Sequence, residues 1–157
     1  MKVLQGNGIT RGRASGEAIV TRTPMNLTAA HTKFFNLLRR GQVWDRHHEL
    51  FRKQVNGKIL VLPRCVGSTF TGIVLLELIY REASPLAIVV GQADSLLVSG
   101  SMLADVWLDH AIPVVEYSKP DLFDSIHTGD SVTVDAGTGE ILVQAPEPES
   151  AYVPGGV

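Results

Sequence analysis

The most chemically suggestive residues of the sequence lie together in one short segment, Pro63-Arg64-Cys65-Val66-Gly67-Ser68-Thr69. A continuous apolar run precedes the segment and a helical pattern follows it, so we expect it to join the carboxyl end of a buried strand to the amino end of a helix. The first turn of a helix has unpaired N–H groups and a partial positive charge, which favour a carboxylate or a phosphate. Because open α/β sheets usually bind ligands at this end of their strands, Ser68 or Thr69 would lie in a field suited to an anion.

A simpler interpretation makes Ser68 the residue that caps the helix and Gly67 an ordinary turn residue. On the residues alone, this capping role is favoured over a chemical one. Two familiar motifs are absent from the segment. Gly67 and Ser68 lack the glycine spacing and the lysine of a phosphate-binding P-loop, and no Gly-x-Ser-x-Gly elbow occurs here.

The remaining reactive side chains give weaker signals. Cys65 could be a reactive thiol, because a helix N-terminus lowers the pKa of a thiol, but a passive and partly buried thiol is the favoured interpretation. His47 and His48 are adjacent, so on a helix or a strand they point apart, and no metal site is predicted, although one of the two could reach a ligand. Ordinary capping, surface or turn roles are expected for Asp94, His110 and His127.

The elements that must position this segment follow from hydrophobic periodicity. Continuous apolar runs predict buried strands, and apolar spacings of three and four predict helices. Strands are expected at residues 16–21, 58–63, 86–90 and 112–115, and helices at residues 31–40, 69–83 and 95–103. The order strand, helix, strand over residues 58–90 predicts a βαβ unit with a right-handed crossover.

The last part of the sequence predicts a β-hairpin. Residues 130–135 alternate cleanly, Gly137-Thr138-Gly139 is typical of a turn, and residues 140–143 form the returning strand. Residues 42–56 are polar and irregular, so a loop is expected there. The fold class is therefore α/β, with mixed strands, helices on the sheet and a terminal hairpin.

Composition limits the class of protein. The chain has 157 residues, 45% hydrophobic and 19% charged, which fits one soluble globular domain, and its net charge of -2 gives no electrostatic case for nucleic acid or an anionic membrane. The first residues lack the pattern of a signal peptide, and no window is apolar over the roughly 18 residues of a membrane span, so a cytoplasmic location is expected. The single cysteine excludes an internal disulfide and cannot hold an iron–sulfur cluster, which takes about four ligands.

The order and spacing of these segments resemble a known family, the small subunit of aconitase X. The resemblance covers nearly the whole chain up to about residue 143, and its first part includes an opening strand and a substrate-side loop. It rests on residues 12–18, 41–45 with His48, 57–63, 67–69, 74–78, 87–90 with 93–94, and 111–115.

The resemblance implies a single swivelling β/β/α domain over residues 1–144, like the mobile domain of aconitase, followed by a flexible tail at residues 145–157. It also implies a large partner subunit that carries an iron–sulfur cluster, whose iron acts as a Lewis acid on the departing hydroxyl. The activity would be the dehydration of a small hydroxy acid. We expect cis-3-hydroxy-L-proline first, because the few charged residues do not resemble a hyperthermophile, and phosphomevalonate as the alternative.

The resemblance also assigns roles to residues of the candidate segment. The proton-abstracting serine of the family falls on Ser68, and we expect Gly67, Thr69, Arg64 and His48 to contact the substrate. A serine is a poor base in water, but the amino end of a helix and a nearby cation such as Arg64 can stabilise its alkoxide in a closed site.

The sequence departs from the family pattern around the expected substrate loops, which leaves room for other functions. Cys65-Val66 stands where a glycine and a basic residue are expected, Phe70-Thr71-Gly72 replaces a run of small serines, and Glu49 replaces a proline. A phosphohistidine carrier is one alternative, because the final hairpin resembles that of phosphotransfer swivelling domains, although no histidine lies at the strand–helix junction. A non-catalytic scaffold subunit is the other.

Overall fold

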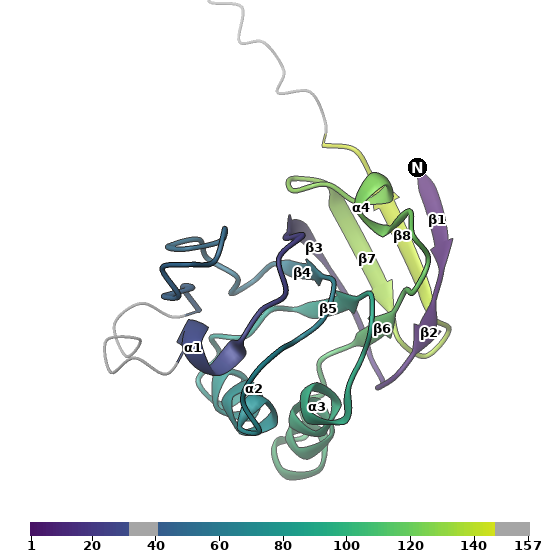
Figure 1. Ribbon diagram of the computed structural model, residues 1–157. Helices are drawn as coiled ribbons and strands as arrows, with labels where there is room; N and C mark the ends of the chain where they lie inside the picture. The colour runs from purple at the N-terminus through teal and green to yellow at the C-terminus, as the bar shows by residue number, and fades with distance from the viewer. Residues whose placement is uncertain (32–40, 147–157) are drawn as a thin grey trace, which may run out of the picture.

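The computed structural model describes residues 1–31 and 41–146 of the chain. Four helices and eight strands lie in these ranges (Figure 1). The helices are α1 (Leu27–His31), α2 (Thr71–Tyr80), α3 (Ser95–Leu108) and α4 (Leu122–Ser125). The strands are β1 (Lys2–Gln5), β2 (Asn7–Gly8), β3 (Arg13–Val20), β4 (Ile59–Leu62), β5 (Ala87–Val90), β6 (Val114–Glu116), β7 (Ser131–Asp135) and β8 (Glu140–Gln144).

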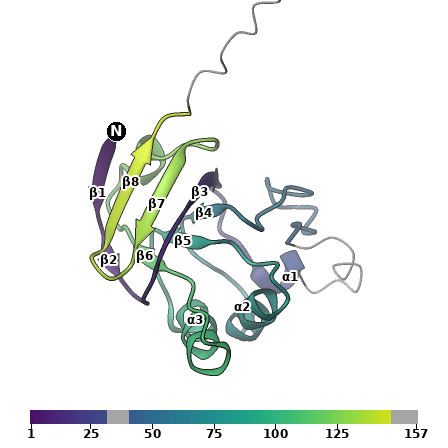
Figure 2. The same cartoon turned by 180° about the vertical axis from the view of Figure 1, so that it is seen from behind.

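All eight strands form one sheet in the order β1-β8-β7-β3-β4-β5-β6-β2. Strand β3 joins its two parts, because residues 13–17 pair antiparallel with β7 and residues 18–20 pair parallel with β4. Strands β1 and β2 follow each other in the chain, yet they pair with β8 and β6 at opposite ends of the order. The N-terminal segment therefore closes the sheet on itself, and Figures 1 and 2 show it running along the hairpin toward β6.

Glycines allow this closure, because the N-terminal segment approaches other backbone closely. A Cβ on Gly8 would lie 1.8 Å from the carbonyl oxygen of Ala136, and one on Gly6 would lie 2.6 Å from that of Glu116. Hydrophobic periodicity did not predict β1 and β2, because only Leu4 of β1 is buried and the other residues of β1 and β2 are exposed or partly so. One inward residue is too few for a periodic pattern.

The sheet separates two hydrophobic cores, and this explains the continuous apolar runs of its central strands. In β4, Leu60 and Leu62 pack in the core shared with the helices, whereas Ile59 and Val61 pack in the inner core against the hairpin. Strand β5 alternates in the same way. This arrangement of two strand layers and one helix layer confirms the predicted α/β class and its β/β/α form.

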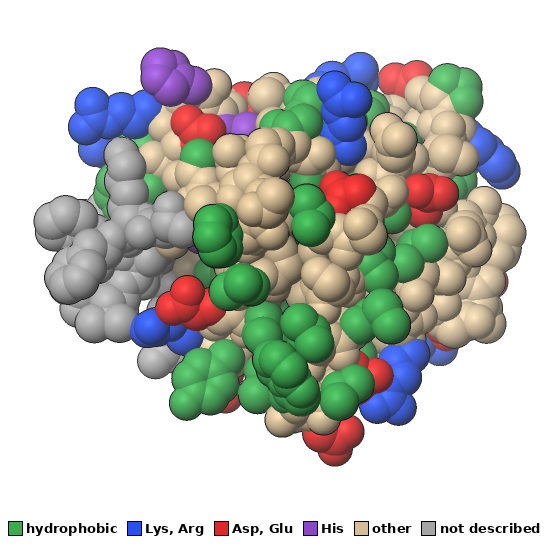
Figure 3. All heavy atoms as spheres, turned by 60° about the horizontal axis from the view of Figure 1, so that its bottom comes forward, with side chains coloured by type: hydrophobic (Ala, Val, Ile, Leu, Met, Phe, Trp, Pro, Cys, Tyr) green, Lys and Arg blue, Asp and Glu red, His purple; other side chains and the backbone are tan. Residues whose placement is uncertain are grey.

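Helices α2 and α3 cover one face of the parallel strands and pack closely against each other (Figure 2). Their contact depends on Gly72 and Gly100, because a Cβ on Gly100 would lie 2.5 Å from the carbonyl oxygen of Gly72. Gly100 thus has a packing reason inside a helix, where glycine otherwise costs stability. Figure 3 turns the side of α2 and α3 toward the viewer. Ile73 of α2 and Met102 and Trp107 of α3 are among the exposed large hydrophobic residues.

Several predicted bounds are corrected by the structure. Helix α2 is shorter than residues 69–83, because Glu82 takes a left-handed conformation (φ 54°) and ends the helix. Helix α3 continues to Leu108 rather than ending at residue 103, and the strand expected at residues 112–115 is β6. The terminal hairpin and the βαβ order are confirmed. The helix predicted at residues 31–40 falls outside the described residues except for His31, as does most of the expected tail.

Candidate functional site

The candidate site lies where the parallel strands β3, β4 and β5 end, which we call the carboxyl edge. Ser68 lies in the loop that follows β4, and its side chain is half-buried. Its Oγ accepts a hydrogen bond from the backbone N–H of Phe70 at 3.0 Å, while its carbonyl oxygen accepts from the hydroxyl of Thr71 at 2.8 Å. Since α2 begins at Thr71 and its N-cap position is Phe70, the Ser68 side chain precedes the cap rather than forming it.

Gly67 fixes the path of this loop. Its φ of +90° is in a region that side chains rarely adopt, and a Cβ there would lie 2.4 Å from Nδ2 of Asn26. The side chain of Asn26 therefore packs against the turn beside Ser68. Asn26 also caps the short helix α1, because its Oδ1 accepts from the N–H of Ala29 at 3.1 Å.

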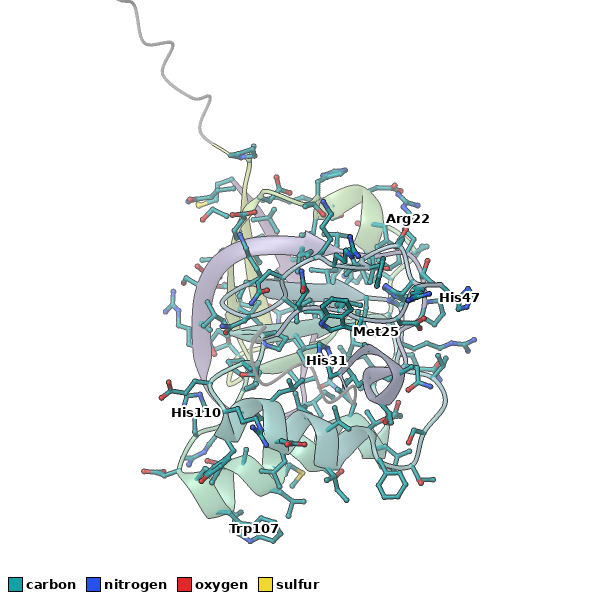
Figure 4. The ribbon with its side chains drawn as sticks, turned by 90° about the vertical axis from the view of Figure 1, so that its left-hand side faces the viewer. Arg22, Met25, His31, His47, Trp107 and His110 are labelled. Atoms are coloured by element: carbon teal, nitrogen blue, oxygen red, sulfur yellow. The ribbon has the colours of Figure 1, made fainter. Side chains whose placement is uncertain are left out.

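The connection between β3 and α1 runs beside the Ser68 loop. Met25 pairs with Cys65 in a parallel bridge, in which the N–H of Met25 donates to the carbonyl of Arg64 at 3.2 Å and that of Val66 donates to the carbonyl of Met25 at 3.0 Å. Figure 4 shows Met25, Arg22 and His47 toward one end of the domain, with His110 toward the other. Residues from three distant parts of the sequence thus meet at the carboxyl edge.

His48 belongs to this edge, but its ring is buried and engaged with the fold. Its Nε2 lies 3.2 Å from the carbonyl oxygen of Thr23, and its Nδ1 accepts from the N–H of Leu50 at 3.1 Å. With Nδ1 as the acceptor, Nε2 is the ring nitrogen that can donate to the carbonyl of Thr23. In the described conformation His48 therefore orders the loop of residues 42–56, and its direct contact with a substrate stays a prediction.

Glu49 also makes contacts at the carboxyl edge, but no sequence pattern predicted it as a functional residue. Its Oε1 accepts hydrogen bonds from the hydroxyl of Thr21, from the N–H of Arg22 at 2.6 Å and from the N–H of Thr23 at 3.1 Å. The hydrogen bond from Thr21 is the main cause that lowers the pKa of the Glu49 carboxyl, and the two backbone N–H groups add to it. The one signal in the sequence was that Glu49 departs from the residue expected there.

The other predicted residues of the loop differ in exposure. Arg64, Gly67 and Thr69 are exposed, so they are accessible to a ligand that approaches the carboxyl edge. Cys65 is buried, and this burial, together with the charge of Asp94, raises the pKa of its thiol to about 12. A thiol of this kind is protonated at neutral pH, which supports the passive role expected for Cys65.

The described residues of this chain do not fit an iron–sulfur cluster or a single metal ion. Within residues 1–31 and 41–146, no group of three or more His, Cys, Asp or Glu side chains is arranged to hold a metal. The chain has one cysteine, and its thiol is buried with a raised pKa. A cluster ligated by thiolates thus finds no set of ligands here.

The sequence matches the family described as the aconitase X swivel domain over residues 3–143. The chain therefore belongs to this family. Curated relatives are named phosphomevalonate dehydratase small subunit. The protein of Thermococcus kodakarensis is 33% identical over 89% of this chain and 95% of its own length, and that of Archaeoglobus fulgidus is 32% identical over 85% and 92%. Within the family, the chain is thus the small subunit of an aconitase X-type dehydratase, a hydro-lyase.

Solved structures agree with this assignment. The crystal structure of Thermococcus kodakaraensis aconitase X in its holo-form matches with a TM-score of 0.77 and 31% identity, over 92% of this chain and 99% of that chain. A solution NMR structure of a UPF0107 protein matches with a TM-score of 0.76 and 31% identity, over 91% and 99%. The predicted swivelling-domain fold is therefore confirmed. Among the described residues, no helix has the length and apolar character needed to cross a membrane.

Proposed function

We propose that this chain is the small subunit of a phosphomevalonate dehydratase and works with a large subunit. The support comes from the names of its relatives, including that of Methanosarcina mazei, which is 30% identical over 88% of each chain. These names favour phosphomevalonate, the alternative substrate of the family, over cis-3-hydroxy-L-proline, the substrate expected first. Because the described residues of this chain offer no cluster site, we place the iron–sulfur cluster on the large subunit, and no step below depends on it.

We propose Ser68 as the proton acceptor, and the observation that carries this role is the hydrogen bond from Phe70 to Oγ. When Oγ carries negative charge as an alkoxide, this N–H donor already points at it, and the amino end of α2 adds a favourable field. The alkoxide takes a proton from the carbon next to the substrate carboxylate, so a C–H bond breaks and an O–H bond forms at Oγ. The electron pair left on carbon then forms the double bond as hydroxide departs.

The surroundings of Ser68 support this role physically. Gly67 lets the backbone turn tightly beside Asn26, so the loop is held in one conformation before substrate arrives. Arg64 is exposed on the same loop, where a cation can bind the substrate carboxylate or phosphate. Closure of the domain over a partner would remove water from this edge and strengthen each of these interactions.

The test is a copurification of this chain with its candidate large subunit, followed by parallel assays with phosphomevalonate and cis-3-hydroxy-L-proline. We expect turnover of phosphomevalonate that needs both chains. Ser68→Ala should lower kcat by about 10²–10⁴-fold, because it removes the proton acceptor. The same variant should keep the complex intact, because it removes one partly exposed hydroxyl.

Ser95→Ala is the matched control, since Ser95 is an exposed serine at the start of α3, the helix that follows β5 at the same edge. It should keep the full turnover of the unmodified complex. Full turnover by Ser68→Ala would exclude Ser68 as the proton acceptor. A stable complex that turns over only cis-3-hydroxy-L-proline would overturn the proposed substrate and keep the subunit assignment.

Of the two adjacent histidines at this edge, His47 is exposed, whereas His48 does not fit the role of a phosphohistidine. His48 uses both ring nitrogens in contacts with Thr23 and Leu50 and is buried. A phosphohistidine needs an exposed nitrogen that a partner can reach. The scaffold function predicts an intact complex without substrate turnover, and turnover that depends on Ser68 would exclude it.

A further inference from the structure

The bend at residues 21–23, which follows β3, holds a single negatively charged oxygen with three donors. The hydroxyl of Thr21 and the backbone N–H groups of Arg22 and Thr23 all donate to Oε1 of Glu49. Convergent donors on one oxygen are the arrangement that stabilises an oxyanion in an enzyme site. Here the oxyanion is supplied by the chain itself.

The donors are held in place by contacts that do not involve Glu49. The side chain of Thr21 is almost fully buried, and its backbone N–H donates to the carbonyl of Val61 at 2.9 Å. The guanidinium of Arg22 lies over the ring of Phe123, 5.4 Å from its centroid, and donates to the carbonyl of that residue at 3.2 Å. The bend is therefore a preformed set of donors, anchored to β4 and α4.

Glu49, by contrast, is an exposed residue in a loop of turns, and its carboxylate reaches the bend from outside. Its low pKa has its main cause in the hydrogen bond from Thr21, so the bend favours a negative oxygen. The bend leads directly into Met25, which pairs with Cys65 three residues before Ser68. An oxyanion held at this bend therefore lies on the same edge as the proposed proton acceptor.

We propose that the Thr21–Thr23 bend is an oxyanion-binding subsite and that Glu49 is its exchangeable internal ligand. An oxygen of the substrate carboxylate or phosphate replaces Oε1 of Glu49 when substrate binds at the carboxyl edge. The part of this proposal that concerns substrate rests on the proposed function. The binding of an oxyanion at the bend does not, and it is tested without any turnover.

The experiment uses the full chain, labelled with ¹⁵N, in the unmodified form and as Glu49→Ala. The chain is suited to NMR by itself, because both hydrophobic cores form within it and a relative of 31% identity has a solution NMR structure. Inorganic phosphate and acetate are titrated separately while the amide resonances of Arg22 and Thr23 are followed. We expect saturable shifts in Glu49→Ala, with binding at least about ten-fold weaker in the unmodified chain, where Glu49 competes. The tighter of the two probes identifies the substrate group that the bend takes.

Two further variants separate a subsite from a loop that is merely loosened. Adding Thr21→Val to Glu49→Ala keeps the side-chain shape but removes the hydroxyl donor, together with the contacts of Oγ1 with the carbonyl oxygen (3.2 Å) and the N–H (3.0 Å) of Thr23. It should weaken anion binding by about ten-fold. Asp45→Ala is the matched control, because it removes another carboxylate from the same loop and leaves Glu49 in place. The Oδ1 of Asp45 accepts a hydrogen bond from the backbone N–H of His47 at 3.0 Å. It should bind anions as weakly as the unmodified chain.

Anion binding that is absent from a folded Glu49→Ala chain, or equal in Glu49→Ala and the unmodified chain, would overturn the proposal. If Glu49→Ala does not fold, Glu49→Gln replaces it, because the neutral amide keeps the size and one acceptor oxygen. Phosphate or acetate should displace the amide more easily than the carboxylate, and the same binding as in the unmodified chain would again overturn the subsite. A negative result in this anion-binding experiment would not change the interpretation of the Ser68→Ala assay, so the two proposals are tested separately.

Discussion

The hairpin side and the carboxyl edge of this domain are held together in different ways. On the hairpin side, β1, β8 and β7 are joined by continuous backbone pairing, with registers such as Lys2 with Val143 and Ser131 with Gln144. At the carboxyl edge, the contacts between segments are largely made by particular side chains on backbone groups. Glu49 and His48 on the bend of residues 21–23 are the main examples.

This difference indicates where substitutions can change function with little loss of stability. Backbone ladders tolerate many side chains as long as the inner residues stay apolar, so this side is a scaffold. Side-chain contacts at the edge depend on one residue each, and many of those residues are exposed. Substitutions at the edge should therefore alter binding and turnover, whereas substitutions in the inner core should alter stability.

The largest expected effect comes from breaking the inner core. Ile59 of β4 is fully buried in the inner core, which it shares with residues of the hairpin. Ile59→Ala should lower the free energy of unfolding by about 2–5 kcal/mol, because it removes buried methyl groups and leaves a cavity. The measurement is urea denaturation followed by circular dichroism. Its control, Ile73→Ala on the exposed face of α2, should change the stability by less than about 0.5 kcal/mol. An equal loss in both variants would contradict the division into scaffold and surface.

The same difference explains how much of the fold could be predicted. The strand over residues 59–62, the helix after it and the terminal hairpin follow from local periodicity, which the sequence displays directly. The junction that carries Ser68 could be located for the same reason, because a strand end and a helix start are both local signals. The N-terminal strands were missed, because Leu4 is the one buried residue of β1.

The contacts of the carboxyl edge were beyond sequence reasoning, because they join segments far apart in the chain. Glu49 meets Thr21 across 28 residues, and no local pattern announces that pairing. Asn26 did carry a local signal, since an asparagine three residues before Ala29 is typical of a helix cap. It was missed because the helix was expected to begin at His31, whereas α1 begins at Leu27.

A second prediction concerns how the free energy of unfolding depends on pH. His31 is buried on the helical side, and burial lowers its pKa to about 4, from about 6.5 in an unfolded chain. Between these values the unfolded state binds the proton more tightly, so stability falls as the pH is lowered from 7 toward 4. This shift in the pKa of His31 corresponds to a loss of about 3 kcal/mol in the free energy of unfolding between pH 7 and pH 4. Urea denaturation at several pH values measures it.

His31→Gln should flatten this part of the pH dependence, because it removes the group that must charge on unfolding. His47→Gln is the control, since it replaces an exposed histidine and keeps His31, so the pH dependence that His31 causes should remain. A slope that survives in His31→Gln would show that the pH dependence arises elsewhere.

The smallest expected effect is on stability and concerns Asp94. It tests whether a polar side chain at the carboxyl edge can have a structural role alone, without acting on the substrate. Asp94 caps α3, and its Oδ1 accepts from the N–H groups of Leu96 at 2.8 Å and Leu97 at 2.9 Å. Asp94→Ala should cost about 1 kcal/mol of stability, and Asp94→Asn only a few tenths, because asparagine caps almost as well. Neither should lower the turnover of the complex with the large subunit. If Asp94→Asn kept the stability but lost turnover, the carboxylate of Asp94 would act on the substrate, and the boundary between the cap and the site at this edge would have to be moved.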